Sequence, residues 1–167
     1  MNYSDVQSSQ YLTFQVAAET YGVSIKRVHG ILEHMPVTPV PGSSPFVRGV
    51  FNHGGIITPV IDLAARLGLG ETTVTRGTCF ILVGAAHEDE ELPMGLMVHA
   101  VTDVIDVETK DIQPPPDFGT RVRLDYLEGL TRTGDGFTVL LSVDRFLTAN
   151  ELLEVRAHAR GDLAEEN

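Results

Sequence analysis

The sequence has a single cysteine, Cys79, among its 167 residues. One thiol cannot build an internal disulfide framework, which indicates a protein of the reducing cytoplasm. Basic residues are also scarce, because 12 lysines and arginines stand against 23 acidic residues and give a formal charge of −11. A surface this acidic repels nucleic-acid phosphates and anionic lipids, which argues against nucleic-acid binding and direct membrane contact.

Long hydrophobic runs and targeting features are absent as well. No apolar stretch approaches the roughly 18–20 residues that a membrane-spanning helix requires. The N-terminal residues 1–5 contain neither the basic segment nor the apolar segment of a secretory signal. Hydrophobic residues nevertheless make up 43% of the chain, enough to bury a core, so we expect a folded cytoplasmic protein.

The residue patterns of an active site are missing too. No glycine-rich segment is followed by the Lys-Ser or Lys-Thr of a phosphate loop, no nucleophile elbow occurs, and no histidine pair has metal-site spacing. Cys79 lies in an apolar run, where a thiol is normally inert core. Asp62 and Asp144 each follow a strand, which favours helix capping over a catalytic carboxylate pair. We expect no enzyme activity, cofactor or metal.

The order of hydrophobic patterns predicts an all-β protein in one domain. Residues 1–10 are polar and are expected to form a mobile arm, and residues 161–167 an acidic tail. Between them, apolar residues alternate at period two in several short runs, as in half-buried strands. Thr148 and Glu151 make a capping box that opens a helix over residues 149–160.

The chain also resembles itself. A first repeat of about residues 11–68 and a second of about residues 78–148 show the same features in the same order. The matches are Tyr21–Ile25 with Met94–Val98, Val28 and Ile31 with Val101 and Val104, Phe46–Val50 with Tyr126–Leu130, and Val60–Asp62 with Ser142–Asp144. One repeat buries only a thin core, so the duplication predicts two closed five-stranded barrels, one for each repeat, that share an apolar seam.

Residues 46–63 carry the most specific motif, Phe46-Val47-x-Gly49-Val50-x-Asn52-x-x-Gly55 followed by Ile57-x-Pro59-Val60-Ile61-Asp62-Leu63. With Gly95-Leu96-x-Val98 and Tyr126-Leu127-x-Gly129-Leu130, this motif resembles the CheW family of bacterial chemotaxis coupling proteins over about residues 11–153. The resemblance implies two SH3-like barrels and a cytoplasmic scaffold. Such a scaffold links chemoreceptor tips to the regulatory domain of the histidine kinase CheA, at the cytoplasmic face of receptor arrays.

The resemblance also implies a set of receptor-facing residues. Carried over by motif, they are Val28, Gly49, Ile57, Phe80 and Val104. For each apolar member, burial in the core is the alternative explanation. Gly49 has a backbone explanation as well, since Gly129 occupies the same place in the second repeat.

Three positions depart from the family pattern. Gly30 stands where the family usually has glutamate, Gly54 where it usually has arginine, and His99 where it often has aspartate. A glutamate–arginine ion pair on adjacent strands would explain why both residues are lost together, since removing one partner alone leaves the charge of the other unpaired. In the second repeat the counterpart of Gly30 is still an acid, Asp103. A divergent paralogue that serves a motility or pilus array, and binds the kinase but only weakly a receptor tip, is the alternative function.

Overall fold

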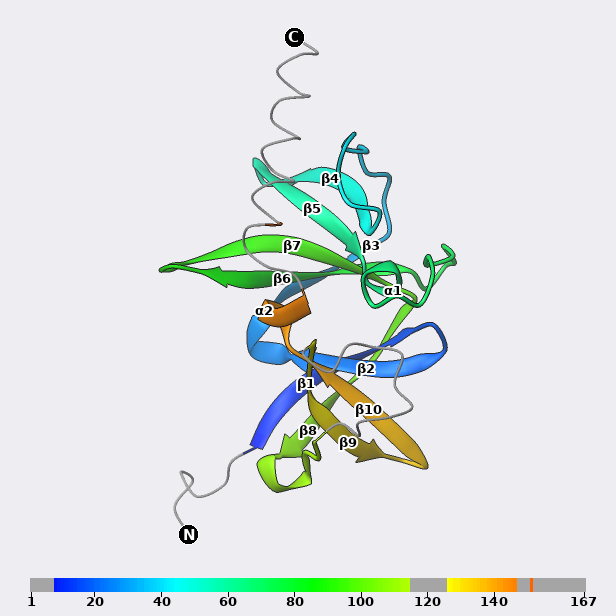
Figure 1. Cartoon of the computed structure of the whole chain (residues 1–167), viewed down its shortest axis with the longest axis vertical. Helices are drawn as coiled ribbons and strands as arrows, with labels where there is room; N and C mark the ends of the chain where they lie inside the picture. The colour runs from blue at the N-terminus through cyan, green and yellow to red at the C-terminus, as the bar shows by residue number, and fades with distance from the viewer. Residues whose placement is uncertain (1–7, 115–125, 147–150, 152–167) are drawn as a thin grey trace.

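The structure, a computed structural model, describes residues 8–114, 126–146 and 151 (Figure 1). The described residues are mostly strands. The strands are β1 (Ser8–Val16), β2 (Glu19–Ser24), β3 (Val28–Glu33), β4 (Val47–His53), β5 (Ile56–Asp62), β6 (Cys79–His87), β7 (Glu90–Val98), β8 (Ala100–Glu108), β9 (Leu127–Thr133) and β10 (Gly136–Leu141). The helices are short: α1 (Leu63–Arg66), α2 (Val143–Phe146) and the 3₁₀ turns η2 (Ile25–Arg27) and η3 (Thr109–Asp111).

The strands form two five-stranded sheets that lie one above the other in Figure 1. One sheet has the order β8-β1-β2-β10-β9, and the other has the order β3-β6-β7-β5-β4. The expected all-β fold with two five-stranded units is therefore confirmed. We call the first the lower barrel and the second the upper barrel.

Each barrel takes strands from both repeats. The hairpin β1–β2 belongs to the first repeat but pairs with β8 and β10, while β6–β7 of the second repeat pairs with β3 and β5. Exchanging each strand of the first repeat with the strand five numbers later turns one sheet order into the other, so the duplication is a structural one. The expectation of one barrel for each repeat is wrong, because the repeats exchange their first hairpins.

The pairing also corrects one repeat match. Gly49 pairs with Val60, and Gly129 pairs with Leu140 in the same way. Counting on along the chain, the equivalent of Asp62 is Ser142, two positions before Asp144. The backbone N–H groups of Asp62 and Ser142 donate to the matched carbonyls of Phe46 and Tyr126, at 2.7 and 2.9 Å. Asp144 is therefore the equivalent of Ala64.

An isolated bridge helps to close each barrel at equivalent places. Thr38 bridges to Val50 in the upper barrel, and Gln113 bridges to Leu130 in the lower one. The segments that contain Thr38 and Gln113 pass close to Gly49 and Gly129 respectively. The φ angles of these glycines are +151° and +158°. A Cβ atom on Gly129 would lie 2.6 Å from the carbonyl oxygen of Gln113, and one on Gly49 would overlap the carbonyl oxygen of Thr38. Both glycines are thus explained by close backbone approach.

The core divides into a seam and two barrel interiors. The seam joins side chains of both barrels in one cluster, with Phe14, Tyr21, Ile81, Met94 and Leu141 among its members. Smaller clusters fill the lower barrel around Leu140 and the upper barrel around Phe80. Alternate residues of β6 face the seam and the upper interior, which explains why its sequence is continuously apolar.

Several boundaries differ from the sequence predictions. Ser8–Gln10 begin β1 and pair with β8, so this part of the expected arm is a strand. The hairpin β6–β7 continues to the pair His87–Glu90, further than the apolar pattern predicts, because backbone pairing does not require apolar side chains. The expected helix over 149–160, the tail over 161–167 and Thr148 of the capping box lie outside the described residues.

Candidate functional site

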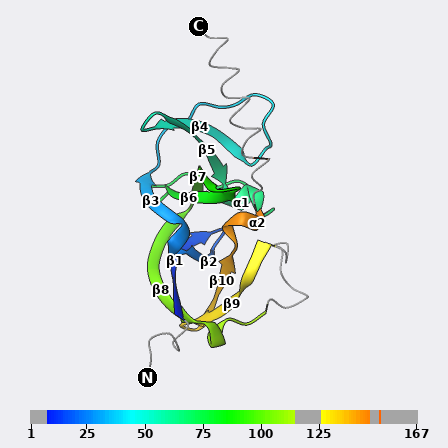
Figure 2. The same cartoon turned by 90° about the vertical axis from the view of Figure 1, so that its left-hand side faces the viewer.

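Two apolar side chains stand exposed at equivalent positions of the two barrels. Val104 on β8 lies opposite Leu12 and is 44% exposed, and Ile31 on β3 lies opposite Ile81 and is 48% exposed. Their strands β3 and β8 are each at the end of a sheet order, and Figure 2 shows both along the same side of the molecule. Ile31 is missing from the set that the family motif predicts, although the repeat match to Val104 is present in the sequence.

Two other members of the predicted receptor-facing set are partly exposed. Val28 begins β3 and packs its inner side against the seam. Ile57 on β5 packs against the small cluster of Val40 and Val50. Both side chains belong to the upper barrel, whereas Val104 belongs to the lower one.

The remaining two members, Phe80 and Gly49, are internal. Phe80 is 1% exposed and packs against Val60, Met97 and the ring of Phe51, with ring centroids 6.0 Å apart. Gly49 is buried beneath the bridge of Thr38 to Val50. Both residues therefore have structural roles inside the upper barrel. Their motif positions alone did not distinguish such a role from a surface role.

The three altered family positions lie in different surroundings. Gly30 sits on β3 opposite Leu82, and Gly54 lies in the β4–β5 turn at a φ of +60°. β3 and β4 are at opposite ends of the sheet order and are not hydrogen-bonded neighbours, so the expected facing of these two positions stays a prediction that would have to be met across the closing side of the barrel. His99 lies exposed between β7 and β8, and its backbone N–H donates to the carbonyl of Gln15 at 2.9 Å.

A charged cluster lies at one side of the junction between the barrels; we call it the Arg27 site. The Arg27 guanidinium donates to both carboxylate oxygens of Asp144, each at 2.7 Å, and to the carbonyl of Gly84. The N–H of Ala86 donates to the same carboxylate at 2.9 Å. The carboxylate Oε1 of Glu91 lies 3.7 Å from Nε of Arg27. The site therefore connects three segments that are distant in the sequence.

These contacts stabilise both charged forms. The hydrogen bonds from Arg27 lower the pKa of Asp144 below its ordinary value of 3.8, and the N–H of Ala86 adds to this effect. The same bonds raise the pKa of Arg27. Asp144 lies inside α2 rather than at its N-cap, so the predicted capping role of this residue is wrong. Sequence reasoning missed the pair because 117 positions separate the two residues and no local pattern marks them.

Asp62 does serve as a cap, and it is buried. Its carboxylate accepts from the N–H of Ala65 in α1 at 3.5 Å, and from the N–H and hydroxyl of Thr72 at 2.9 and 2.6 Å. Arg48 lies 3.6 Å from the carboxylate and donates to the carbonyl of Thr72 at 3.0 Å. These bonds fix the loop that follows α1 against the upper barrel.

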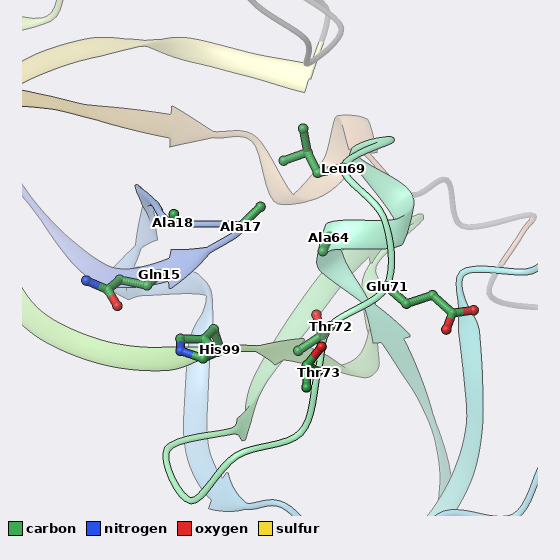
Figure 3. Close-up of a pocket in the computed structure, with 9 residues that line it drawn as sticks. All are labelled: Gln15, Ala17, Ala18, Ala64, Leu69, Glu71, Thr72, Thr73 and His99. Atoms are coloured by element: carbon green, nitrogen blue, oxygen red, sulfur yellow. The ribbon is translucent and has the colours of Figure 1, made fainter.

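A pocket of about 610 Å³ lies between this loop and the lower barrel (Figure 3). Figure 3 shows the β1–β2 turn on one side, α1 and the loop on the other, and His99 near the base, while the Glu71 carboxylate points outward. Small and polar side chains dominate its walls. The lining residues are Gln15, Ala17, Ala18, Ala64, Leu69, Glu71, Thr72, Thr73 and His99.

Reactive groups are not gathered in the part of the chain that the structure covers. Within the described ranges, no three His, Cys, Asp or Glu side chains are grouped to hold a metal ion. Burial raises the pKa of the Cys79 thiol, which disfavours the reactive thiolate. No described helix combines the length and the apolarity for crossing a membrane.

Comparison with known proteins gives one consistent family. The model of the CheW-like domain family matches residues 10–151. The chain is 30% identical to the chemotaxis protein CheW of Treponema pallidum over 143 residues, covering 86% of this chain and 84% of that protein. It is 37% identical to the chemotaxis protein CheW of Bacillus subtilis over 106 residues, covering 64% of this chain and 65% of that protein. The crystal structure of the scaffolding protein TtCheW from Thermoanaerobacter tengcongensis superposes with a TM-score of 0.78 at 28% identity, covering 90% of this chain and 95% of that one.

Proposed function

Because this chain belongs to the CheW-like domain family, we propose that it is a cytoplasmic scaffold that couples chemoreceptor tips to a CheA-type histidine kinase. The observation that carries the proposal is the family match across nearly the whole two-barrel unit, with relatives named as chemotaxis proteins. The scaffolding description of the similar crystal structure supports a role in binding rather than in catalysis.

The exposed pair Ile31 and Val104 is the surface that we assign to the receptor tip, together with Val28 and Ile57. Apolar side chains nearly half exposed on the outer strands of a folded domain favour a protein contact. Phe80 and Gly49 support this surface from within, because each holds the upper barrel together beneath it. His99, Gly30 and Gly54 are positions where contacts of this chain would differ from those of its relatives.

Isothermal titration tests the proposal with two purified partners. The full chain is titrated with a CheA regulatory domain and, separately, with a helical fragment of a receptor tip from the same cell. We expect saturable binding to both and a complex of all three on gel filtration. Failure to bind the kinase domain would overturn the proposal, whereas binding the kinase but not the tip would indicate the divergent paralogue instead.

A further inference from the structure

Each barrel presents an exposed apolar residue with an acid two positions further along the same strand. In the upper barrel the pair is Ile31 and Glu33 on β3, and in the lower barrel it is Val104 and Asp106 on β8. All four side chains are exposed. Residues two apart on a strand lie on the same face, about 7 Å from one another, so each apolar side chain has a carboxylate as its neighbour.

The strand pairing sets which way these side chains face, because directly opposite residues of a ladder share one face of the sheet. On β3, Glu33 lies opposite Cys79, a member of the seam cluster. On β8, Val104 lies opposite Leu12, another member of that cluster. Each pair thus lies on the face of its sheet that carries the seam, on the last strand of the sheet order.

The two pairs occupy equivalent positions in the duplication. Ile31 matches Val104 in the repeat, and the strand register is regular from each of them to the acid that follows. Figure 2 shows both strands along the same side of the molecule. The same apolar–acid pair is therefore offered twice on that side.

The strands around the two pairs carry no basic residue. β3 and its neighbour β6, like β8 and its neighbour β1, contain neither lysine nor arginine. The exposed imidazole of His29 on β3 contacts Glu91, at 2.8 Å. Among the described residues, neither Glu33 nor Asp106 makes an ion pair or a side-chain hydrogen bond.

The cations nearest in the sequence do not neutralise the two acids. Arg27 precedes β3 and donates to Asp144, while Lys110 follows β8 and lies 3.3 Å from Glu108. Lys26 lies beyond the start of β3, at the other end from the acid of that strand. A partner would therefore meet uncompensated negative charge beside each apolar side chain.

Protection of the sheet edges is the alternative role of these acids. Charged residues on the end strands of a sheet discourage pairing with another chain. That role accepts a charge of either sign and makes no demand on the neighbouring residue. The repeated association of an acid with an exposed apolar side chain favours a contact surface instead.

We propose that Glu33 and Asp106 select the partner of this surface, which carries a lysine or arginine beside each of its apolar contact residues. The inference rests on the proposed function, in which Ile31 and Val104 contact a receptor tip. A helical partner places residues three or four positions apart about 5–6 Å from one another, so an apolar residue and a basic residue on the next turn reach one pair together. The apolar contact supplies affinity, and the carboxylate discriminates between basic and acidic partners.

Isothermal titration of the full chain with a helical receptor-tip fragment from the same cell tests the inference. The double variant Glu33→Gln with Asp106→Asn should bind about four- to twentyfold more weakly than the parent at low salt, because each exposed ion pair contributes a factor of about two to five. At about 1 M salt, where the Debye length is about 3 Å, this difference should disappear.

The outcomes separate the inference from the proposed function. Equal affinity of the parent and the double variant at low salt would overturn the inference and leave the receptor assignment standing. A parent chain that does not bind the fragment would overturn the receptor assignment itself, and the inference with it. Thermal melting checks that the variant folds, which is expected because both side chains are exposed.

The matched control is the double variant Glu71→Gln with Asp135→Asn. It removes the same two charges from exposed positions in the loop after α1 and in the β9–β10 turn, rather than from an outer strand. Its affinity for the fragment should stay within about twofold of the parent. An equal loss in both double variants would show that net charge alone steers the partner, which contradicts selection by Glu33 and Asp106.

The partner supplies the second half of the test. A tip fragment whose lysines and arginines are replaced by glutamine should bind the parent and the Glu33→Gln, Asp106→Asn variant equally, because no base remains to pair. Circular dichroism checks that this fragment is still helical. A persistent difference in affinity would contradict the pairing. Self-association of the double variant on gel filtration, without any loss of affinity for the unaltered fragment, would assign the two acids to edge protection and overturn the inference.

Discussion

Gly49 lies so close to Thr38 that a side chain at position 49 would overlap the carbonyl oxygen of Thr38. The contact sits where the bridge of Thr38 to Val50 helps to close the upper barrel, and Gly129 repeats it against Gln113 in the lower barrel. Both glycines also have φ angles that other residues rarely adopt. Barrel closure thus explains Gly49, which the family motif alone would assign to partner contact, together with its equivalent Gly129 in the second repeat.

Replacing either glycine by alanine should destabilise the whole fold. We expect Gly49→Ala and Gly129→Ala each to lower the free energy of unfolding by about 2–4 kcal/mol, because the new methyl group forces the bridge apart. Urea denaturation followed by circular dichroism measures the change. The control is Gly136→Ala, where nothing lies within 4 Å of the new Cβ and the change should stay within about 0.5 kcal/mol.

The Arg27–Asp144 pair should contribute measurably to stability. A double-mutant cycle with Arg27→Met and Asp144→Asn isolates the pair, since methionine keeps much of the apolar stem. We expect a coupling of about 1–2 kcal/mol, more than for a single exposed ion pair, because two parallel hydrogen bonds hold a partly buried guanidinium. The exposed pair Lys110–Glu108, 3.3 Å apart, serves as the control and should show almost no coupling.

The same pair predicts a pH dependence. The pKa of Asp144 is lower in the folded protein than its ordinary value of 3.8, so its stabilising effect is fully present above about pH 4 to 5 and is lost as the pH falls through the lower, folded value. The difference in unfolding free energy between the parent and Asp144→Asn should therefore be constant near neutral pH and shrink in acid. A difference that grows in acid would contradict the assigned cause.

Much of this architecture could be predicted from the sequence. The alternation of apolar residues gives the strands, and the matched motifs around Gly49 and Gly129 give the duplication. The exchange of hairpins could not be predicted, because β1 and β6 present equivalent patterns to either β3 or β8. The sequence pattern is the same whichever copy completes a barrel.

The sequence also could not show which apolar strand residues are exposed and which are buried. Val104 and Phe80 are both apolar residues in strands, yet one is 44% exposed and the other fills the upper barrel. The pairing of Asp144 with Arg27 depends on how the two barrels sit together. Assigning Asp144 as the match of Asp62 was an error of two positions, since both aspartates follow a strand and the aligned residue is Ser142.

The exposed apolar pair gives a direct test of the receptor surface. We expect Val104→Glu and Ile31→Glu each to weaken binding to a receptor tip about tenfold or more, because a desolvated charge replaces an apolar contact. Stability should change by no more than about 0.5 kcal/mol, since both side chains are already exposed. Isothermal titration and urea denaturation measure the two effects.

The matched control for this surface is Val74→Glu. Val74 is 46% exposed, close to the 44% of Val104, but lies in the loop between α1 and β6 rather than on an outer strand. Binding to the tip should be unaffected. Equal loss of affinity in Val74→Glu and Val104→Glu would mean that added negative charge, rather than the apolar contact, weakens the complex.

The altered positions Gly30 and Gly54 supply the final prediction. Gly54 has a φ of +60°, so Gly54→Arg alone should cost about 1 kcal/mol of stability, and the control Gly54→Asn should cost less because asparagine tolerates this conformation. Gly30→Glu alone adds a negative charge to an already acidic chain and should not raise the free energy of unfolding.

The double variant Gly30→Glu with Gly54→Arg tests whether the lost residues formed an ion pair. If they did, the pair should add about 0.2–1 kcal/mol to the free energy of unfolding, and this gain should fade with added salt. β3 and β4 are not paired strands, so such a pair must form across the closing side of the barrel rather than along a ladder. Strictly additive changes in a denaturation cycle at low salt would show that the two losses are independent.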